Sequence, residues 1–309
     1  MSIKNLGFRD LQYLVAIAEN GSFGKAAAAC GISQPALSER VKRIEYTLGA
    51  CLFERSKRGL TITAIGEPVI YKARELLDEA IEIDQIVAAG GQPLVGTLRV
   101  GAIATLGPYL FPLVLPQLRR RYPKLELILH EGLTDVLLAR LMAGALDVVL
   151  AAAPLQLPGV SEINLFREPL VLATPIDHPF AALQAVNPTA LCGDDMVLLE
   201  DGHCLSGHAL DVCPGARGRK RERLHAMSLE TLRHMVAAGS GYTLLPVLAV
   251  GEHPPLNDLV SYVPLDEEQR YGRVITMAYR KSYSRVDELK LLADVIRQSL
   301  PSGQGISLL

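Results

Sequence analysis

The chain has 309 residues, 49% of them hydrophobic, so it is long enough to build two or three folded units with cores of their own. No apolar run reaches the ~20 residues that cross a bilayer, and residues 1–20 carry acidic side chains in place of a signal peptide's apolar block. These features argue against a membrane protein and an exported one, and we expect a cytoplasmic protein.

Charge is distributed unevenly along the chain. The net charge is −2, but residues 1–64 carry nine Lys and Arg against five Asp and Glu, a balance of +4 that leaves −6 for residues 65–309. A basic head (residues 1–64) on an acidic body predicts that only the head meets nucleic acid.

The head has the pattern of three helices. Apolar residues recur on one helical face over residues 8–19. Ser22 can cap a second, alanine-rich helix, Gly31 turns the chain, and Ser33 caps a third helix that ends at Gly49. Two helices joined by a tight glycine turn predict a helix-turn-helix, whose last helix enters the major groove of DNA.

Polar and basic side chains gather at the start of the third helix and in the segment after it. Residues 52–55 and 60–63 are predicted to be short strands of a basic hairpin, or wing. A solvated charged surface is the other interpretation, but the order of caps and turns favours DNA binding. The candidate DNA contacts are Ser33, Gln34, Pro35, Ser38, Arg40, Lys42, Arg43, Arg55, Lys57 and Arg58.

Residues 69–87 place apolar side chains four and three apart, the spacing of a coiled-coil seam. We expect this linker helix to bury its apolar face against a second copy and to hold two heads together. Residues 90–93 then form a linker. The seam residues are Val69, Ala73, Leu76, Ala80, Ile83 and Val87, with Ile70, Leu77 and Ile81 beside them.

Beyond the linker, strands and helices alternate, which predicts an α/β body. The expected strands cover residues 97–102, 125–130, 147–152, 170–174, 196–200, 242–245 and 274–279. The expected helices cover residues 111–121, 135–143, 229–238 and 286–300. Ligands of such sheets bind at the carboxyl ends of strands, where Thr105 and the segment Glu200–Cys204 fall.

Residues 200–213 set two cysteines nine positions apart beside two histidines. Cys204 falls near the N-terminus of a short predicted helix, where the helix dipole and His203 and His208 favour the thiolate. If the segment is helical, the Cα atoms of Cys204 and Cys213 are about 13 Å apart, too far for a disulfide unless the helix unwinds. A thiol with its partner out of reach is suited to a redox switch.

Two other interpretations fit the same spacing. Both cysteines could be small core residues, because unpaired cysteine is among the most buried residue types. Alternatively, His203, Cys204, His208 and Cys213 could form a zinc-like site, although the spacing is not that of a common zinc finger.

The other cysteines and a basic loop carry no predicted function. Five cysteines without an export signal argue against a permanent disulfide framework, so any disulfide is expected to be transient. Cys30, Cys51 and Cys192 are interpreted as structural residues. The basic residues from Arg217 to Arg223 are interpreted as a solvated loop.

The head contains four short motifs in order: Ala26-Ala27, Ser33 to Ser38, Leu48-Gly49 and Leu52 to Arg55. With these residues it resembles the LysR-type transcriptional regulators. The resemblance covers nearly the whole chain and implies a winged helix-turn-helix, a dimerising linker helix and an effector domain similar to periplasmic binding proteins, made of two α/β subdomains.

The resemblance also implies domain boundaries. The winged helix-turn-helix covers residues 1–64, the linker helix and hinge 65–93, and the effector domain 94–301. Subdomain I covers residues 94–167 and 272–301, and subdomain II covers 168–271. The two chain crossings between them are expected near Phe166–Glu168 and Glu268–Gly272.

The body carries three further motifs, Leu106 to Leu110, Leu199 to Cys204 and Ser228 to Leu232. Through them it is similar, within that family, to the hydrogen peroxide sensors. By this resemblance Cys204 is the peroxidatic thiol and Cys213 the resolving thiol. Thr105, Thr134, His203 and Arg273 hold the peroxide oxygens, in agreement with the need for hydroxyls and a cation around a departing oxygen.

The chain departs from the pattern of these sensors at one place. They usually have Arg-Asp-Gln after Cys-Leu, whereas this chain has Ser206-Gly207-His208, so the assisting carboxylate is missing. We expect the switch to survive with altered kinetics, because the glycine eases unwinding while His208 adds a base one turn after Cys204.

The sequence thus predicts a peroxide-activated regulator that binds double-stranded DNA as a homodimer or homotetramer and works with RNA polymerase and a thiol reductant. No cofactor, resident metal or membrane partner is expected. One alternative is a LysR-type regulator of a small metabolite or metal. Another is a thiol peroxidase-like enzyme, against which the DNA-binding head argues.

Overall fold

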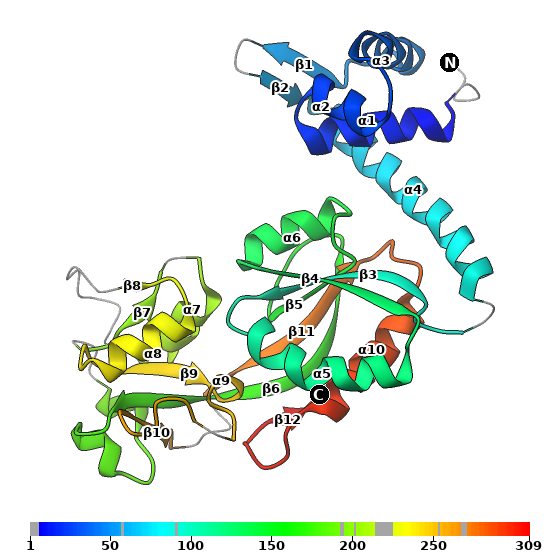
Figure 1. Ribbon diagram of the computed structural model, residues 1–309. Coiled ribbons are helices and arrows are strands. Elements are labelled where there is room, and N and C mark those ends of the chain that lie inside the picture. Colours follow the sequence, from blue (N-terminus) through cyan, green and yellow to red (C-terminus); the bar gives the residue numbers. More distant parts are fainter. Residues whose placement is uncertain are drawn as a thin grey trace. The chain divides into compact units, whose positions relative to one another are not determined.

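The computed structural model describes residues 6–56, 59–89, 92–191, 195–200, 202–213, 225–252, 254–266 and 271–309 (Figure 1). The chain divides into two compact units. The first holds residues 1–92 and 142–144, and the second holds residues 93–141 and 145–309. Several predicted features lie outside the described residues, namely Lys57 and Arg58, Cys192, the basic run from Arg217 to Arg223, and the beginning of the second crossing at Glu268.

The head begins with three helices, α1 (Phe8–Asn20), α2 (Phe23–Ala29) and α3 (Gln34–Leu48). The Ser33 hydroxyl accepts a hydrogen bond from the Ala36 amide at 3.4 Å, and α3 ends at Gly49, which has a φ of 69°. Gly31, with a φ of +67°, makes the turn between α2 and α3. These are the caps and turns that the sequence predicts, and the helix-turn-helix is confirmed.

The wing is a hairpin of β1 (Phe53–Ser56) and β2 (Gly59–Ile62), which pair antiparallel from Phe53 opposite Ile62. The Glu45 carboxylate on α3 accepts hydrogen bonds from the amides of Leu52 and Phe53 at 2.7 and 3.1 Å. These hydrogen bonds fix the base of the wing to α3.

The linker helix α4 (Gly66–Ala89) divides into two parts. Ile70 is buried in the head's own hydrophobic core and Ala73 is also buried, at 1% and 2% exposure, so neither is available to a second copy as the sequence predicted. They pack inward because α4 lies along α1. Leu76 and Ile83 are 39% and 64% exposed and keep the seven-residue spacing of a seam.

The body is built around an eight-stranded mixed sheet with the strand order β10-β6-β11-β5-β3-β4, to which β9 and β12 add along β6. Strand β3 pairs parallel with β4 and β5, whereas β11 pairs antiparallel with β5 and β6. The strands are β3 (Gly96–Ile103), β4 (Leu125–Gly132), β5 (Val148–Ala152), β6 (Val160–Pro175), β9 (Thr243–Pro246), β10 (Val260–Pro264), β11 (Gly272–Arg280) and β12 (Ser307–Leu308).

The helices of the body are α5 (Gly107–Arg121), α6 (Thr134–Met142), α7 (Cys204–Val212), α8 (Leu229–Ala237), α9 (Val247–Val250) and α10 (Val286–Ser299). Short 3-10 helices cover Pro179–Ala182 and Pro188–Ala190, and β7 (Leu198–Leu199) pairs parallel with β8 (His225–Ala226). Helix α5 begins four residues before the predicted start, because Gly107 and Pro108 are compatible with a first turn.

Strand β6 is much longer than the predicted strand over residues 170–174. It spans 16 residues, of which the first part, Val160 to Pro169, pairs with β11 (Figure 1). Its residues Leu165 and Phe166 belong to one hydrophobic cluster, and Leu170 to Ala173 belong to another. We call these the first cluster and the second cluster. The body therefore has two cores joined by continuous strands, the arrangement expected of two α/β subdomains.

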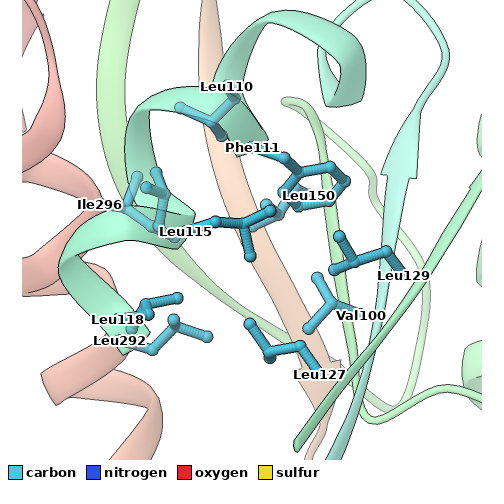
Figure 2. Close-up of a pocket in the computed structure, with 11 residues that line it drawn as sticks. Val100, Leu110, Phe111, Leu115, Leu118, Leu127, Leu129, Leu150, Leu292 and Ile296 are labelled. Atoms are coloured by element: carbon cyan, nitrogen blue, oxygen red, sulfur yellow. The ribbon is translucent and has the colours of Figure 1, made fainter. Parts of the chain in front are cut away.

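An apolar pocket of about 20 Å³ lies in the first cluster beneath α5 and α10 (Figure 2). Phe111 and Leu115 of α5 face Leu127 and Leu129 of β4 across it. Space of this size admits at most one water, and no polar group lines it, so it is a packing gap and not a ligand site. Across the described residues, no helix combines the length and apolarity needed to cross a membrane.

Candidate functional site

Helix α7 presents Cys204 as its first residue. His203 is the N-cap, and Gly202 before it has a φ of +100°, a conformation that glycine adopts readily. The thiol of Cys204 is half-buried and packs at the edge of the first cluster. The predicted position of Cys204 near the N-terminus of a short helix is confirmed.

Cys213 is the C-cap of the same helix, and its amide donates to the Ala209 carbonyl at 3.0 Å. It is 1% exposed and belongs to the second cluster. Since α7 is helical throughout, the Cα atoms of Cys204 and Cys213 are about 13 Å apart. The two sulfur atoms are not bonded to each other, and they cannot bond while α7 is intact.

A cavity of about 430 Å³ opens beside Cys204. It brings Cys204 together with two residues predicted to hold the peroxide, His203 and Thr134, and with His208, which was predicted as an added base and as a possible metal ligand. The Thr134 hydroxyl lies at the start of α6. The lining residues are Thr134, Asp135, Leu138, Ala152, Ala153, Pro154, Leu155, Gly202, His203, Cys204, Gly207, His208 and Asp211.

The other two predicted site residues, Thr105 and Arg273, are bonded to each other. Arg273 Nη1 donates to Thr105 Oγ1 at 2.8 Å, and Nη2 donates to the Thr105 carbonyl at 2.9 Å. Both side chains are buried, and neither lines the cavity as the structure describes it. Arg273 is nevertheless close enough to His208 to lower the pKa of that histidine.

Glu168 was missed by the sequence-based prediction. Arg273 Nε donates to Glu168 Oε2 at 2.8 Å, and both side chains are 0% exposed. The other carboxylate oxygen accepts from the Leu248 amide at 3.0 Å. A carboxylate two residues before the apolar run Leu170–Ala173 was the available signal, because a buried charge requires a partner.

Two buried polar atoms at the cavity have no hydrogen-bond partner among the described residues, Thr134 Oγ1 and His208 Nδ1. Buried polar atoms are seldom left unsatisfied, so the cavity is suited to a small polar ligand or water. Burial lowers the pKa of His203, with Glu200 opposing. Burial and then Arg273 lower the pKa of His208, with Asp211 opposing.

The proposed zinc-like quartet is not assembled. No group of three or more His, Cys, Asp or Glu suited to a metal ion occurs within the described residues. The reason is that Cys213 packs in the second cluster, at the far end of α7 from Cys204 and His208.

The candidate DNA contacts on α3 divide into two kinds. Ser33, Gln34, Pro35, Lys42 and Arg43 are exposed, and Ser38 is half-buried. Arg40, another predicted DNA contact, forms a bidentate pair with the buried Asp10 carboxylate, with Nη2 at 2.9 Å from Oδ2, and its side chain stays 40% exposed. The side chain of Arg55, on β1, lies outside the described residues, as do Lys57 and Arg58.

The Arg40–Asp10 pair fixes α3 against α1. Burial raises the pKa of Asp10, but the hydrogen bonds from Arg40 and the Gly7 amide outweigh it and lower the pKa overall. Of the cysteines interpreted as structural, Cys51 is exposed after the end of α3, which does not suit a structural core residue, and Cys30 is half-buried.

Family models match both parts of the chain. Residues 8–67 match the model described as "Bacterial regulatory helix-turn-helix protein, lysR family". Residues 91–301 match the "LysR substrate binding domain". The "Hydrogen peroxide-inducible genes activator" of Dickeya chrysanthemi is 40% identical over 295 residues, which cover 96% of each chain.

Two solved OxyR structures are similar to this chain over most of its length. Full-length OxyR from Pseudomonas aeruginosa, in a cysteine-to-aspartate form, is 36% identical with a TM-score of 0.79, over 95% of this chain and 98% of that one. A hydrogen peroxide-bound cysteine-to-serine mutant of Corynebacterium glutamicum OxyR is 34% identical with a TM-score of 0.65, over 95% and 92% of the two chains. The chain therefore belongs to the LysR family of bacterial helix-turn-helix regulators and, within it, to the OxyR group.

Proposed function

We propose that this protein is a DNA-binding transcriptional regulator that senses hydrogen peroxide through oxidation of Cys204 and a disulfide between Cys204 and Cys213. One observation carries the proposal: Cys204 begins a helix in a polar cavity, while Cys213 ends the same helix in a different hydrophobic cluster. The membership of the OxyR group, which includes peroxide-inducible activators, supports the choice of ligand.

The chemistry has two steps. The Cys204 thiolate attacks one peroxide oxygen, the O–O bond breaks, and the other oxygen leaves as hydroxide and takes a proton to become water. The Cys213 thiol then attacks the sulfenic sulfur, a disulfide forms, and a second water leaves. In the first step Thr134 and His203 hold the peroxide oxygens in the cavity, and Arg273, oriented by Glu168 and Thr105, provides positive charge.

The second step makes oxidation a conformational signal. Leu205, Ala209, Val212 and Cys213 are all buried in the second cluster on one side of α7. The disulfide requires α7 to unwind, so oxidation must withdraw some of these side chains from the cluster. The packing of the effector domain consequently differs between the reduced and oxidised forms.

The head and linker helix deliver that signal to DNA. In this proposal the winged helix-turn-helix covers residues 1–64, the linker helix and hinge 65–93, and the effector domain 94–301. Two or four copies bind promoter operators in the cytoplasm, contact RNA polymerase, and are reset by a thiol reductant. The protein reacts with peroxide as a switch and not as an enzyme.

A peroxide titration of the full chain tests the proposal. We expect about one peroxide per protomer to give a Cys204–Cys213 disulfide, mapped by mass spectrometry, and to change the affinity for operator DNA. Cys204→Ser should abolish both changes. Oxidation confined to Cys30 or Cys51 would overturn the proposal, and rapid repeated turnover with a thiol reductant would favour the enzyme instead.

A further inference from the structure

We infer that His208 accepts the proton of the Cys204 thiol and then donates it to the oxygen that leaves the peroxide, a role that rests on the function proposed above. His208 lies four residues after Cys204 on α7. Side chains at this spacing are neighbours on one face of a helix, with Cβ atoms about 5–6 Å apart. Both side chains line the same cavity.

One ring nitrogen of His208 is buried and makes no hydrogen bond to the described residues. This atom is Nδ1, which is excluded from solvent. Among those residues, His208 is the one histidine with such a nitrogen. A buried acceptor or donor without a partner costs free energy, so this atom is expected to have a partner when the site functions.

The charges around His208 come from several elements. Arg273 of β11 disfavours the imidazolium, and Glu168 of β6 neutralises part of the arginine's charge. Asp211 on α7 favours the imidazolium, and Asp135 of α6 and His203 line the same cavity. Burial and Arg273 lower the pKa of His208, so the ring is neutral at pH 7 and can accept a proton.

In the proposed reaction His208 first accepts a proton and then returns it. The neutral imidazole takes the thiol proton, giving a thiolate and an imidazolium. The thiolate attacks one peroxide oxygen, the O–O bond breaks, and the departing hydroxide takes the proton from the imidazolium to become water. Cys204 is left as a sulfenic acid and His208 returns to its neutral form, so no additional acid is needed.

Full-length protein carrying Cys213→Ser, which leaves the sulfenic acid without its resolving thiol, is the background for the test. His208→Gln keeps polarity but cannot titrate, and His234→Gln on α8 is the matched control because His234 is exposed and away from the cavity. Two rates are followed from pH 5.5 to 9.5: sulfenic acid formation at Cys204 with hydrogen peroxide, and alkylation of Cys204 by iodoacetamide without peroxide. Circular dichroism checks that each variant is folded.

We expect His208→Gln to slow sulfenic acid formation about 100-fold at pH 7. The difference in rate between His208→Gln and its parent should narrow at pH 9.5, where a thiol ionises without the help of a base. The pH profile of Cys204 alkylation should shift to higher pH in His208→Gln. Unchanged rates and profiles in folded His208→Gln would overturn the role of His208 while leaving the sensor intact. A Cys204 that does not react with peroxide even without substitution at His208 would instead overturn the proposed function.

Discussion

Cys204 and Cys213 lie at the two ends of α7 and pack in different hydrophobic clusters of the same body. Cys204 is half-buried beside the cavity, whereas Cys213 is 1% exposed. Forming a bond between them therefore requires two changes, the unwinding of α7 and the departure of Cys213 from its core. The stability of α7 should control how fast the second step proceeds.

Gly207→Ala should slow disulfide closure. Glycine inside a helix is less stable than alanine by about 0.5–1 kcal/mol, and a Cβ at Gly207 would meet no atom within 4 Å. If this free-energy difference stabilises intact α7 relative to its unwound form, closure of the Cys204–Cys213 disulfide should slow about two- to fivefold. Quenched-flow mass spectrometry measures closure, and sulfenic acid formation at Cys204 is the internal control, which should be unchanged. Equal closure rates would show that unwinding does not limit the reaction.

Glu168→Gln should strongly destabilise the body. Arg273 and Glu168 are both 0% exposed, so removing the carboxylate charge leaves a buried guanidinium without compensation. We expect a loss of about 3–5 kcal/mol in the free energy of unfolding, measured by urea denaturation. Asp294→Asn, which removes a surface pair with Arg297, is the matched control and should cost less than about 1 kcal/mol. Equal effects of the two substitutions would contradict a structural role for the buried pair.

Local sequence patterns predicted much of this fold, but they did not predict which side chains far apart in the sequence form pairs. Ser33 and Gly49 delimit α3 because caps act within a few residues. The partner of Arg273 is 105 positions away, at Glu168, and that of Arg40 is 30 positions away, at Asp10. Nothing in the spacing of a sequence pairs such residues, so neither pair was predicted.

The linker helix illustrates the same limit. Its four-and-three pattern is real, but one apolar stripe serves two partners: Ile70 and Ala73 face the head, and Leu76 and Ile83 remain exposed. Periodicity reports that a face is apolar and does not report which surface covers it. Similarly, Cys204, Thr134 and His203 meet at one cavity, which the resemblance implied but the spacing of these residues did not.

Lowering the pH below about 6.5 should destabilise the folded protein. The pKa values of His130, His203 and His208 are all lowered in the fold, chiefly by burial. In this window the unfolded chain binds more protons than the folded chain, so the free energy of unfolding falls as pH falls. Urea denaturation from pH 8 to 5 measures this slope. His208→Gln should flatten it and His234→Gln should not; a slope unchanged by His208→Gln would contradict the assignment.

Leu76→Asp should disrupt self-association. Leu76 and Ile83 are large, exposed apolar residues one heptad apart on α4, and a charge at the first would be buried in a helix pair. We expect sedimentation to show a shift towards monomer and operator affinity to fall, with the body still folded. Glu79→Gln, which replaces an exposed charged residue of the same helix with an uncharged one, is the control. An intact oligomer in Leu76→Asp would remove α4 from the interface.

Lys42 and Gln34 should contribute to DNA binding in different ways. Both are exposed on α3, Gln34 at its first turn and Lys42 farther along. A lysine that contacts phosphate adds about −0.9 to the slope of log affinity against log salt concentration. Lys42→Ala should therefore flatten the slope by about 0.9 per copy and leave sequence preference intact. Gln34→Ala should instead lower the ratio of specific to non-specific affinity, because an amide reads base edges. Fluorescence anisotropy on operator and scrambled DNA, from 50 to 300 mM salt, separates the two effects. A Lys42→Ala protein with an unchanged slope would place the backbone contacts elsewhere on the head.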